Sequence, residues 1–434
     1  MRKAVRSGKP FRALLAGSAG AAVAVLLWAS GALERWEWRS WDGRVALMAR
    51  TGLATDRIRL VLLDQESLDW GLRENRLSWP WPREVYVPVL RHLKRAGAAT
   101  AVFDVLYTEP SPYGVEDDRA FGEAIRENGS FAGTLFLGAS SGSATAWPPA
   151  VPSPGLSIEG LPEWISAERP RALDAPRALF PVPEVGIHAT RLGNVQNAPD
   201  PDGVYRRVRL FQTFDGRAVP SLALAAYLVA HPGTSLSVRP GLLMVGSTPV
   251  PIDRDGYVIL RFRGPSGTHR AYSVASVIQT ELRIVSGENG PIRDPDAFRG
   301  RHVILGASAP GLLDLRPVPT SSVYAAVELH ATALDNLLAG DFIAPVPPFA
   351  AFPLMLVLGL AGSALATFAR NAAWSVLFLI LVLGAPVVLS LAAYSTGYWL
   401  PLVGPEIAGS LSFVTGVIAG IGFALYFISA VRFG

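Results

Sequence analysis

The segment Ile58-Arg59-Leu60-Val61-Leu62-Leu63-Asp64 is an apolar run of six residues that ends in an acid, which is typical of a buried strand. A loop is expected after it, and a helical pattern follows over residues 85–97. A second apolar run, residues 100–103, also ends in an acid, Asp104. Strand, helix and strand in this order predict a right-handed crossover in a parallel sheet. The expected fold class is therefore α/β, with a mixed, largely parallel sheet and flanking helices.

Four apolar runs of the chain are long enough to cross a bilayer, which takes about 20 residues. They are residues 13–32, 349–368, 373–394 and 402–430. A chain that is 50% hydrophobic and only 17% charged agrees with a membrane-embedded part. The first run has an alternative interpretation as a cleaved signal peptide, with Ser30-Gly31-Ala32 as the cleavage site. The prediction is an α-helical transmembrane region of four helices, so that the lipid bilayer is the first partner.

Basic residues predict the orientation of these helices, because Lys and Arg are retained on the cytoplasmic side. Residues 1–12 form a basic tail, and Arg370 and Arg432 follow the second and fourth runs. The turn at Tyr398-Trp399, between the third and fourth runs, carries no Lys or Arg. With four crossings, both termini are expected in the cytoplasm. Residues 33–343 then form one large domain on the opposite side.

Composition excludes several classes of function. The chain has no cysteine, which removes disulfides, thiolate chemistry and Cys-ligated metals. A formal charge of +4 over 434 residues provides no concentrated basic face for nucleic acid. No nucleophile and base stand at a recognisable spacing, so we expect no enzyme activity from the large domain.

Five acids of the large domain form a predicted ligand or metal crevice at the carboxyl edge of the sheet. They are Asp64, Glu66, Asp104, Glu109 and Asp314. Clustered carboxylates suit Mg²⁺ or Ca²⁺, so a divalent cation is the one cofactor considered. In the alternative, Asp64 and Asp104 cap turns or pair with Arg83 and Arg206.

Two further patterns have both a structural and a functional interpretation. Trp79-Pro80-Trp81-Pro82-Arg83 is a stiff aromatic segment, which predicts either a ligand or partner face or simple core packing. His330, on a predicted amphipathic helix over residues 327–338, is expected to be structural rather than a pH sensor.

Small residues recur at every fourth position in the last apolar run: Ser412, Gly416, Gly420 and Ala424. Ala13, Gly17 and Ala21 repeat this spacing in the first run. Such spacing lets helix backbones approach closely. It predicts either packing among the four helices or the seam of a homodimer.

Several sequence blocks together resemble the CHASE sensory domain of the second type, over roughly residues 44–343. The blocks are residues 62–68, 79–83, 103–111, 193–195, 200–206, 300–307 and 327–336, in that order. The resemblance implies an extracytoplasmic input module of a bacterial receptor, placed between one membrane helix and three more. It also implies a cytoplasmic output, such as a nucleotide cyclase, a histidine or serine/threonine kinase, or a diguanylate cyclase. No output domain follows the last membrane helix before Gly434.

The expected function is a bacterial inner-membrane sensory receptor whose extracytoplasmic (periplasmic) domain detects a stimulus. The signal would reach a cytoplasmic signalling effector in a separate chain or in an absent continuation. One alternative is a scaffold subunit of a cell-envelope complex, with residues 140–183 as its contact segment. Others are a truncated membrane-bound cyclase or kinase, and a catalytic external domain.

Overall fold

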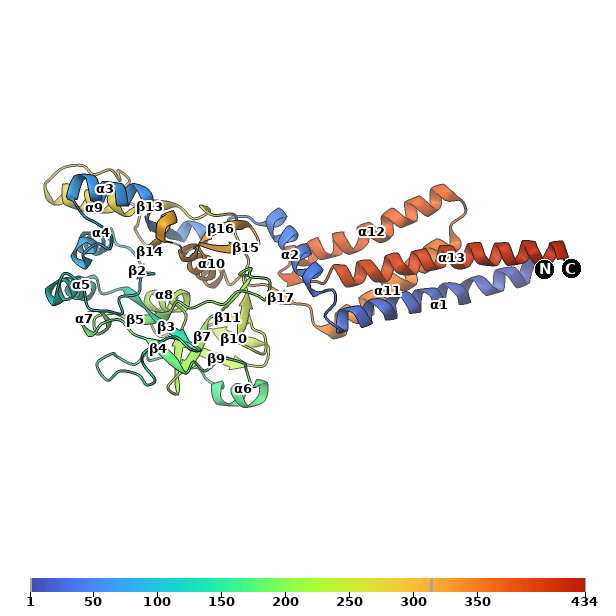
Figure 1. Ribbon diagram of the computed structural model, residues 1–434, viewed down its shortest axis with the longest axis horizontal. Helices are drawn as coiled ribbons and strands as arrows, with labels where there is room; N and C mark the ends of the chain where they lie inside the picture. The colour runs from blue at the N-terminus through green and yellow to red at the C-terminus, as the bar shows by residue number, and fades with distance from the viewer. Residues whose placement is uncertain (1, 313–314, 434) are drawn as a thin grey trace. The chain divides into compact units, whose positions relative to one another are not determined.

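The computed structural model describes residues 2–312 and 315–433 and divides the chain into two compact units (Figure 1). The sheet unit is Ala49–Phe342, and the helical unit combines Met1–Met48 with Ile343–Gly434. Helix α2 (Glu34–Met48) belongs to the helical unit, so the sheet unit begins later than the domain boundary expected at residue 33.

A seven-stranded sheet forms the centre of the sheet unit. Its strands are β1 (Ile58–Leu63), β2 (Thr100–Phe103), β3 (Phe131–Gly138), β4 (Arg177–Leu179), β5 (Arg191–Asn194), β13 (Ala271–Ser273) and β14 (His302–Ala307). The order is β13-β1-β14-β2-β3-β4, and β5 also pairs with β3. Every pairing is parallel except β3 with β4. The predicted mixed, largely parallel sheet is confirmed.

Strand β14 lies between the two strands of the predicted crossover. Its Ile304 is in register with Leu60 of β1 on one side and with Val102 of β2 on the other. The three strands are buried almost throughout, because helices cover both faces of the sheet. Strands β1 and β2 are parallel and belong to one sheet, as predicted, but β14, from about 200 residues further along the chain, lies between them.

Helices form a layer on each face of the sheet (Figure 1). One layer holds α3 (Gln65–Asn75), α4 (Val87–Arg95), α5 (Val115–Asn128) and α9 (Val274–Val285). The other holds α8 (Leu222–Ala230) and α10 (Ala326–Ala339). Alternate strand residues such as Val61, Phe103 and Leu305 pack against α4 and α9 in the main hydrophobic core.

The loop expected after Asp64 is wrong, since α3 begins there. The Asp64 carboxylate accepts a hydrogen bond from the Ser67 backbone N–H at 2.8 Å, which caps the helix. Residue 71, in the middle of α3, is a glycine because a Cβ at this position would lie only 2.6 Å from the Trp81 ring. The expected helix over 85–97 is a short 3₁₀ turn, Arg83–Tyr86, followed by α4.

The remaining strands of the sheet unit form small antiparallel sheets. These pair β6 (Arg207–Arg209) with β12 (Tyr257–Ile259), β7 (Phe211–Phe214) with β8 (Arg217–Pro220), β10 (Leu242–Val245) with β9 (Leu236–Arg239) and β11 (Thr248–Pro251), and β15 (Leu315–Val318) with β16 (Ser321–Ala325). The segment 140–183 includes α6 (Leu161–Glu168) and β4, and α7 (Pro183–Gly186) starts at its end. Its Trp147 and Trp164 are buried, so much of this segment packs on its own unit.

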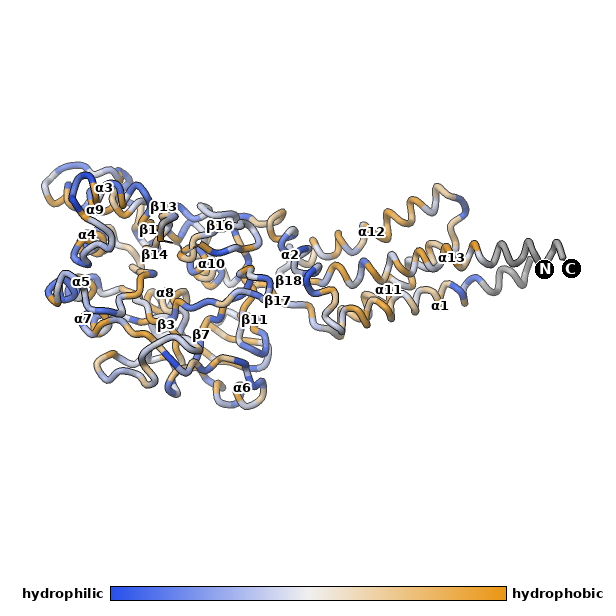
Figure 2. The backbone as a smooth tube through the Cα atoms, viewed as in Figure 1, coloured by the Kyte–Doolittle hydropathy of each residue, from blue (hydrophilic) through white to orange (hydrophobic). Residues whose placement is uncertain are grey.

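The helical unit contains four helices long and apolar enough to cross a membrane: α1 (Arg2–Ala29), α11 (Pro348–Phe368), α12 (Ala372–Ser395) and α13 (Val403–Phe433). Figure 2 shows that most of their coloured residues are hydrophobic and that the turn between α11 and α12 is hydrophilic. Helices α1, α11 and α13 pack closely along their length. The buried residues of α12 are Val382, Pro386, Ser390 and Tyr394, which all lie beyond its first ten residues, and its start diverges from the other helices (Figure 1).

The small residues of α13 do not share one role. The Ser412 hydroxyl donates to the Gly17 carbonyl at 3.2 Å, and Gly416 lies against Ser363 of α11. These two therefore serve packing between helices of the same chain. A Cβ on Gly420 would meet no described residue within 4 Å, and the side chain of Ala424 lies outside the described part of the chain.

Candidate functional site

A cavity of about 270 Å³ opens at the carboxyl ends of β2, β3 and β5. This is the edge of a parallel sheet where ligands bind in α/β folds. Its polar lining residues are Asp104, Gln196, Asn197, Arg316 and His330. Its apolar lining includes Phe136 on β3 and Leu329 on α10. The cavity therefore combines charged groups of both signs with carboxamides and apolar walls.

Asp104 is placed by the end of β2, where its backbone N–H donates to the Leu305 carbonyl of β14 at 2.7 Å. Its side chain is only 10% exposed, and its closest ionisable neighbour among the described residues is His330, with Nε2 3.9 Å from the carboxylate. No hydrogen bond to this carboxylate comes from the residues that the structure describes. Burial raises the pKa of Asp104 to about 7, although the Arg316 charge opposes the shift.

Arg316 and the loop after β5 form opposite parts of the cavity wall and are tied together. The guanidinium of Arg316 lies 5.7 Å from the centre of the Tyr205 ring. The Tyr205 backbone N–H donates to the Pro317 carbonyl at 2.9 Å. The loop that carries Gln196 and Asn197 is thus joined to β15, which carries Arg316.

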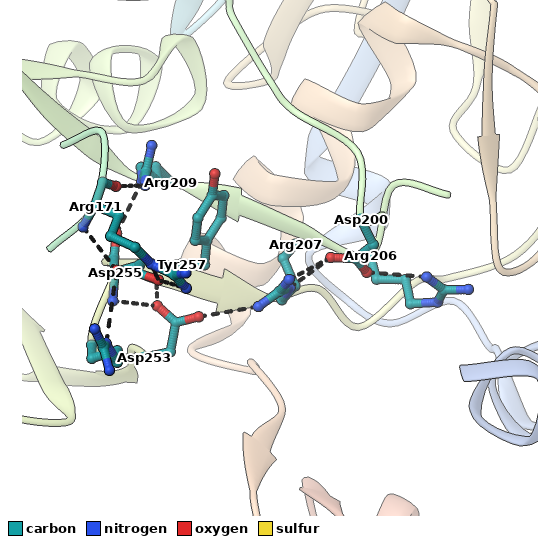
Figure 3. Close-up of polar contacts among 9 residues, drawn as sticks. Arg171, Asp200, Arg206, Arg207, Arg209, Asp253, Asp255 and Tyr257 are labelled. Atoms are coloured by element: carbon teal, nitrogen blue, oxygen red, sulfur yellow. Dashed lines mark hydrogen bonds and ion pairs between the residues drawn. The ribbon is translucent and has the colours of Figure 1, made fainter. Parts of the chain in front are cut away.

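An ion-pair lattice fixes the far end of that loop (Figure 3). Arg206 is fully buried and pairs with Asp200 at 3.1 Å and with Asp202 at 2.7 Å. Arg207 pairs with Asp200 at 2.6 Å and reaches Asp253 at 3.2 Å. Because these carboxylates are occupied by arginine donors, the lattice holds the loop in shape rather than binding a ligand.

The lattice continues onto the strand pair β6–β12 (Figure 3). Arg171 pairs with Asp255 at 2.8 Å, and Arg209 lies 4.2 Å from the centre of the Tyr257 ring. Hydrogen bonds from Arg171 lower the pKa of Asp255. These residues of β6, β12 and the preceding loop are therefore also occupied by contacts with one another, and none of them lines the cavity.

The structure does not bring together the four predicted acids that it describes, Asp64, Glu66, Asp104 and Glu109. Asp64 caps α3, and Glu66 and Glu109 are exposed. Asp314 lies outside the described residues. Strand β14 separates β1 from β2, which puts the ends of these strands about 10 Å apart. Among the described residues no group of three His, Asp or Glu could hold a metal ion, and only Asp104 of this set lines the cavity.

The arginine pairings considered for Asp64 and Asp104 do not form either. Arg83 pairs with Asp118 and donates to the Glu109 carbonyl, while Arg206 joins the lattice. Arg83 also lies over the Tyr107 ring, 5.1 Å from its centre. The arginines therefore hold neighbouring loops rather than the strand-end acids.

The aromatic segment packs the core on the face of the sheet opposite α10. Trp81 is buried in the main core beside Trp70 and Tyr86. Trp79 is 47% exposed and does not line the cavity. The segment therefore shapes the hydrophobic core, and it contributes no wall to the site.

The family model described as CHASE2 domain matches residues 19–366. The chain belongs to the CHASE2 family. This is a family of sensor domains, and the match takes in the whole sheet unit, part of the first candidate membrane span and most of the second. No curated protein and no solved structure matched the chain.

The CHASE2 blocks recognised in the sequence have clear structural positions. Residues 200–206 form the lattice loop, residues 300–307 contain the central strand β14, and residues 327–336 lie in α10. Sequence reasoning missed Gln196, Asn197 and Arg316 as cavity residues and interpreted His330 as structural. The available signal was the position of Gln196 and Asn197 directly after a strand in a turn-rich run.

Helix α10 of the CHASE2 fold runs from the cavity to a second polar cluster around Asp335. Asp335 is fully buried and accepts from the Thr55 hydroxyl at 2.6 Å and from Arg263 Nε at 2.7 Å. His269 Nε2 is 3.6 Å away, and Arg263 also pairs with Asp341. Burial acts to raise the pKa of Asp335, but the neighbouring His269, Arg263 and Thr55 lower it.

In the helical unit, a cluster that we call the Glu37 clamp joins α2 to the start of α13. The Glu37 carboxylate accepts from the backbone N–H groups of Leu402 and Val403 at 2.8–3.0 Å. It also pairs with Arg44 at 2.8 Å. A carboxylate at a helix N-terminus satisfies free N–H groups and complements the helix dipole.

Two neighbouring contacts reinforce the clamp. Trp41 of α2 stacks on Trp399, with ring centres 4.3 Å apart. Residues β17 (Ala344–Pro345) pair with β18 (Tyr398–Trp399). Both segments of the helical unit that continue into the sheet unit are therefore attached to the turn between α12 and α13.

Proposed function

We propose that this CHASE2 protein is a bacterial inner-membrane receptor that detects a small polar ligand in the Asp104 cavity. The observation that carries the proposal is the Asp104 carboxylate, which is buried, faces a cavity and receives no hydrogen bond from the described residues. Burying a carboxylate without a hydrogen-bond donor lowers the stability of the fold, so a ligand that donates a hydrogen bond to it gains binding energy. The cavity volume suits a small molecule.

The proposed relay runs along α10. His330 lines the cavity, and Asp335 lies five residues further along the same helix, about 7.5 Å by its rise. Asp335 binds Thr55 near the start of the sheet unit, and its partner Arg263 binds Asp341 near the end. A ligand that favours one position of α10 would change both chain ends of the unit.

The helical unit would pass the change on through the Glu37 clamp. Helix α2 precedes the sheet unit and strand β17 follows it, and both contact the turn before α13. The signal would then reach a cytoplasmic effector, in a separate chain or in a continuation of this one. The proposal assigns no catalysis to the sheet unit.

The placement of the sheet unit outside the cytoplasm is tested by single-cysteine labelling, because the chain has no cysteine of its own. Leu53→Cys is 94% exposed in the sheet unit, and Ala372→Cys is exposed at the start of α12. In spheroplasts, a membrane-impermeant maleimide should label Leu53→Cys and leave Ala372→Cys unlabelled until the cells are opened. Labelling of the two in the reverse order would contradict the proposed topology.

The binding site is tested on the full-length protein in nanodiscs by thermal unfolding. The probes are Mg²⁺, Ca²⁺, amino acids, dicarboxylates and polyamines at pH 7. A ligand at 100 times its Kd adds about 2.7 kcal/mol of stability. The gain should disappear in Asp104→Asn and His330→Gln and persist in the matched control Asp64→Asn. A gain that survives both cavity substitutions would place the ligand elsewhere.

A further inference from the structure

A second cavity, of about 540 Å³, lies within the helical unit where α12 diverges from α13. Lys9 and Arg12 of α1 and Arg370 of the turn between α11 and α12 line it. Its other walls come from α13, at Gly416 and Gly420. Because an added Cβ at Gly420 meets no atom of the described residues within 4 Å, this glycine leaves space beside them rather than a packing contact.

Among the described residues that line this cavity, three are cationic and none is acidic. The acids of the helical unit are Glu34, Glu37, Asp42 and Glu406, which lie on α2 or in the first turn of α13, at the other end of the helices. An anion from outside the chain is therefore the natural partner for Lys9 and Arg370, which lie beside Arg12.

The walls of the cavity define which anion fits. Arg370 and Lys9 adjoin the ends of the candidate spans Phe349–Phe368 and Lys9–Ala29, at the level where lipid headgroups meet the hydrocarbon region. Val417 and Ile421 provide an apolar wall beside them, and Thr367 and Ser375 add hydroxyl groups. Basic pockets between membrane helices bind anionic headgroups.

We propose that this cavity, between the basic residues Lys9, Arg12 and Arg370 and the glycine face of α13, is a binding site for an anionic phospholipid. The phosphate lies among the three cations, and an acyl chain follows the apolar wall toward the gap beside α12. The lipid fills the space that the divergence of α12 leaves and couples α1, the α11–α12 turn and α13 through one molecule. This site is separate from the Asp104 cavity and does not depend on the proposed receptor function.

The first test measures lipid selectivity by native mass spectrometry of the full-length protein, released from nanodiscs made of equal parts phosphatidylglycerol and phosphatidylcholine. Each basic residue near a headgroup contributes about fivefold in affinity. We expect the wild type to retain phosphatidylglycerol preferentially, Arg370→Gln to lose about fivefold of that preference, and the triple variant K9Q/R12Q/R370Q to lose nearly all of it. The matched control Arg35→Gln, an exposed residue of α2, should retain the wild-type preference.

The second test fills the cavity without changing charge. Gly420→Leu places a side chain in the cavity, while Gly384→Leu places one on α12 outside its lining. At either position an added Cβ meets none of the residues that the structure describes within 4 Å, and leucine favours helix more than glycine, so both variants should fold. We expect about tenfold less retained phosphatidylglycerol in Gly420→Leu and no change in Gly384→Leu.

A third arm distinguishes the lipid from a free phosphate. Millimolar glycerol 3-phosphate should leave the retained phosphatidylglycerol unchanged, because it lacks the acyl chain. If glycerol 3-phosphate displaced the phosphatidylglycerol at a concentration similar to that of the lipid, the site would be one for a soluble phosphate and the lipid assignment would be overturned. Equal retention of the two lipids by the wild type, or an unchanged preference in both the triple variant and Gly420→Leu, would refute the site altogether.

Discussion

Two buried aspartates, Asp335 on α10 and Asp104 beside His330 of the same helix, differ in their supply of hydrogen-bond donors. Asp335 receives hydrogen bonds from Thr55 and Arg263, and its pKa is lowered although burial acts in the opposite direction. Asp104 is nearly as buried, receives no hydrogen bond from the described residues, and has a pKa raised to about 7. The supply of donors, rather than burial alone, separates a structural carboxylate from one that is available to a ligand.

The largest expected effect comes from removing the charge of Asp335, the aspartate that receives several hydrogen bonds. Asp335→Asn should cost about 3–5 kcal/mol of unfolding free energy, because it leaves the buried Arg263 without its closest carboxylate. Chemical denaturation of the purified protein measures this. The control Asp341→Asn, at a carboxylate whose side chain is 34% exposed, should cost less than about 1 kcal/mol. If the two variants lost the same unfolding free energy, the buried Asp335 would be no more important than the partly exposed Asp341.

Replacing Asp104, the aspartate without a hydrogen-bond donor, should raise the unfolding free energy instead of lowering it. The folded-state pKa of Asp104, about 7, lies above its usual 3.8, so ionisation penalises the folded protein as the pH rises from about 4 to above 7. Asp104→Asn cannot ionise. It should stabilise the protein by on the order of 4 kcal/mol at pH 8, at about 1.4 kcal/mol per pKa unit, with almost no gain near pH 4. Melting temperatures measured between pH 4 and pH 8 test this, and a pH-independent difference would argue against it.

The Glu37 clamp extends the comparison to the helical unit, since Glu37 is supplied with donors as Asp335 is. Glu37→Gln should cost about 2 kcal/mol, the scale of hydrogen bonds to a charged group. It should also weaken the near-ultraviolet circular dichroism of the Trp41–Trp399 stack. Glu34→Gln, at an exposed residue of the same helix, is the matched control. An intact aromatic signal in Glu37→Gln would mean that the stack holds α2 without the carboxylate.

The smallest expected effect is at Asp64, which has one local task. Asp64→Ala removes the cap of α3 and should cost about 1 kcal/mol, whereas Asp64→Asn should be nearly neutral because asparagine caps equally well. Thermal unfolding of both variants resolves the difference. A large loss in Asp64→Asn would indicate that the charge has a role beyond capping.

The sequence predicts well those elements whose signal is local. Strands β1 and β2 appear as short apolar runs because both of their faces are buried, and the candidate spans appear because lipid demands long apolar helices. Helix α3 was missed because its polar residues and central Gly71 weaken the helical pattern. The close packing of Gly71 on Trp81 explains the glycine only once the tertiary contact is known.

The site could be predicted only in part, because its walls come from distant segments. Asp64 and Asp104 look alike in sequence, since each follows a buried strand. They differ because β14 lies between β1 and β2 and because Arg316 and His330 reach only Asp104. No local pattern announces these neighbours, which join the site from more than 200 residues away.

The central position of β14 also has a consequence for how the polypeptide matures. Strands β1 and β2 leave the ribosome long before residues 302–307 are made, yet neither pairs with the other in the finished sheet. The nascent chain must therefore keep two apolar strand edges unpaired while it is synthesised, a condition that favours aggregation. Completion of the sheet depends on its last parallel strand, so the sheet unit can close only after residue 307 has been synthesised.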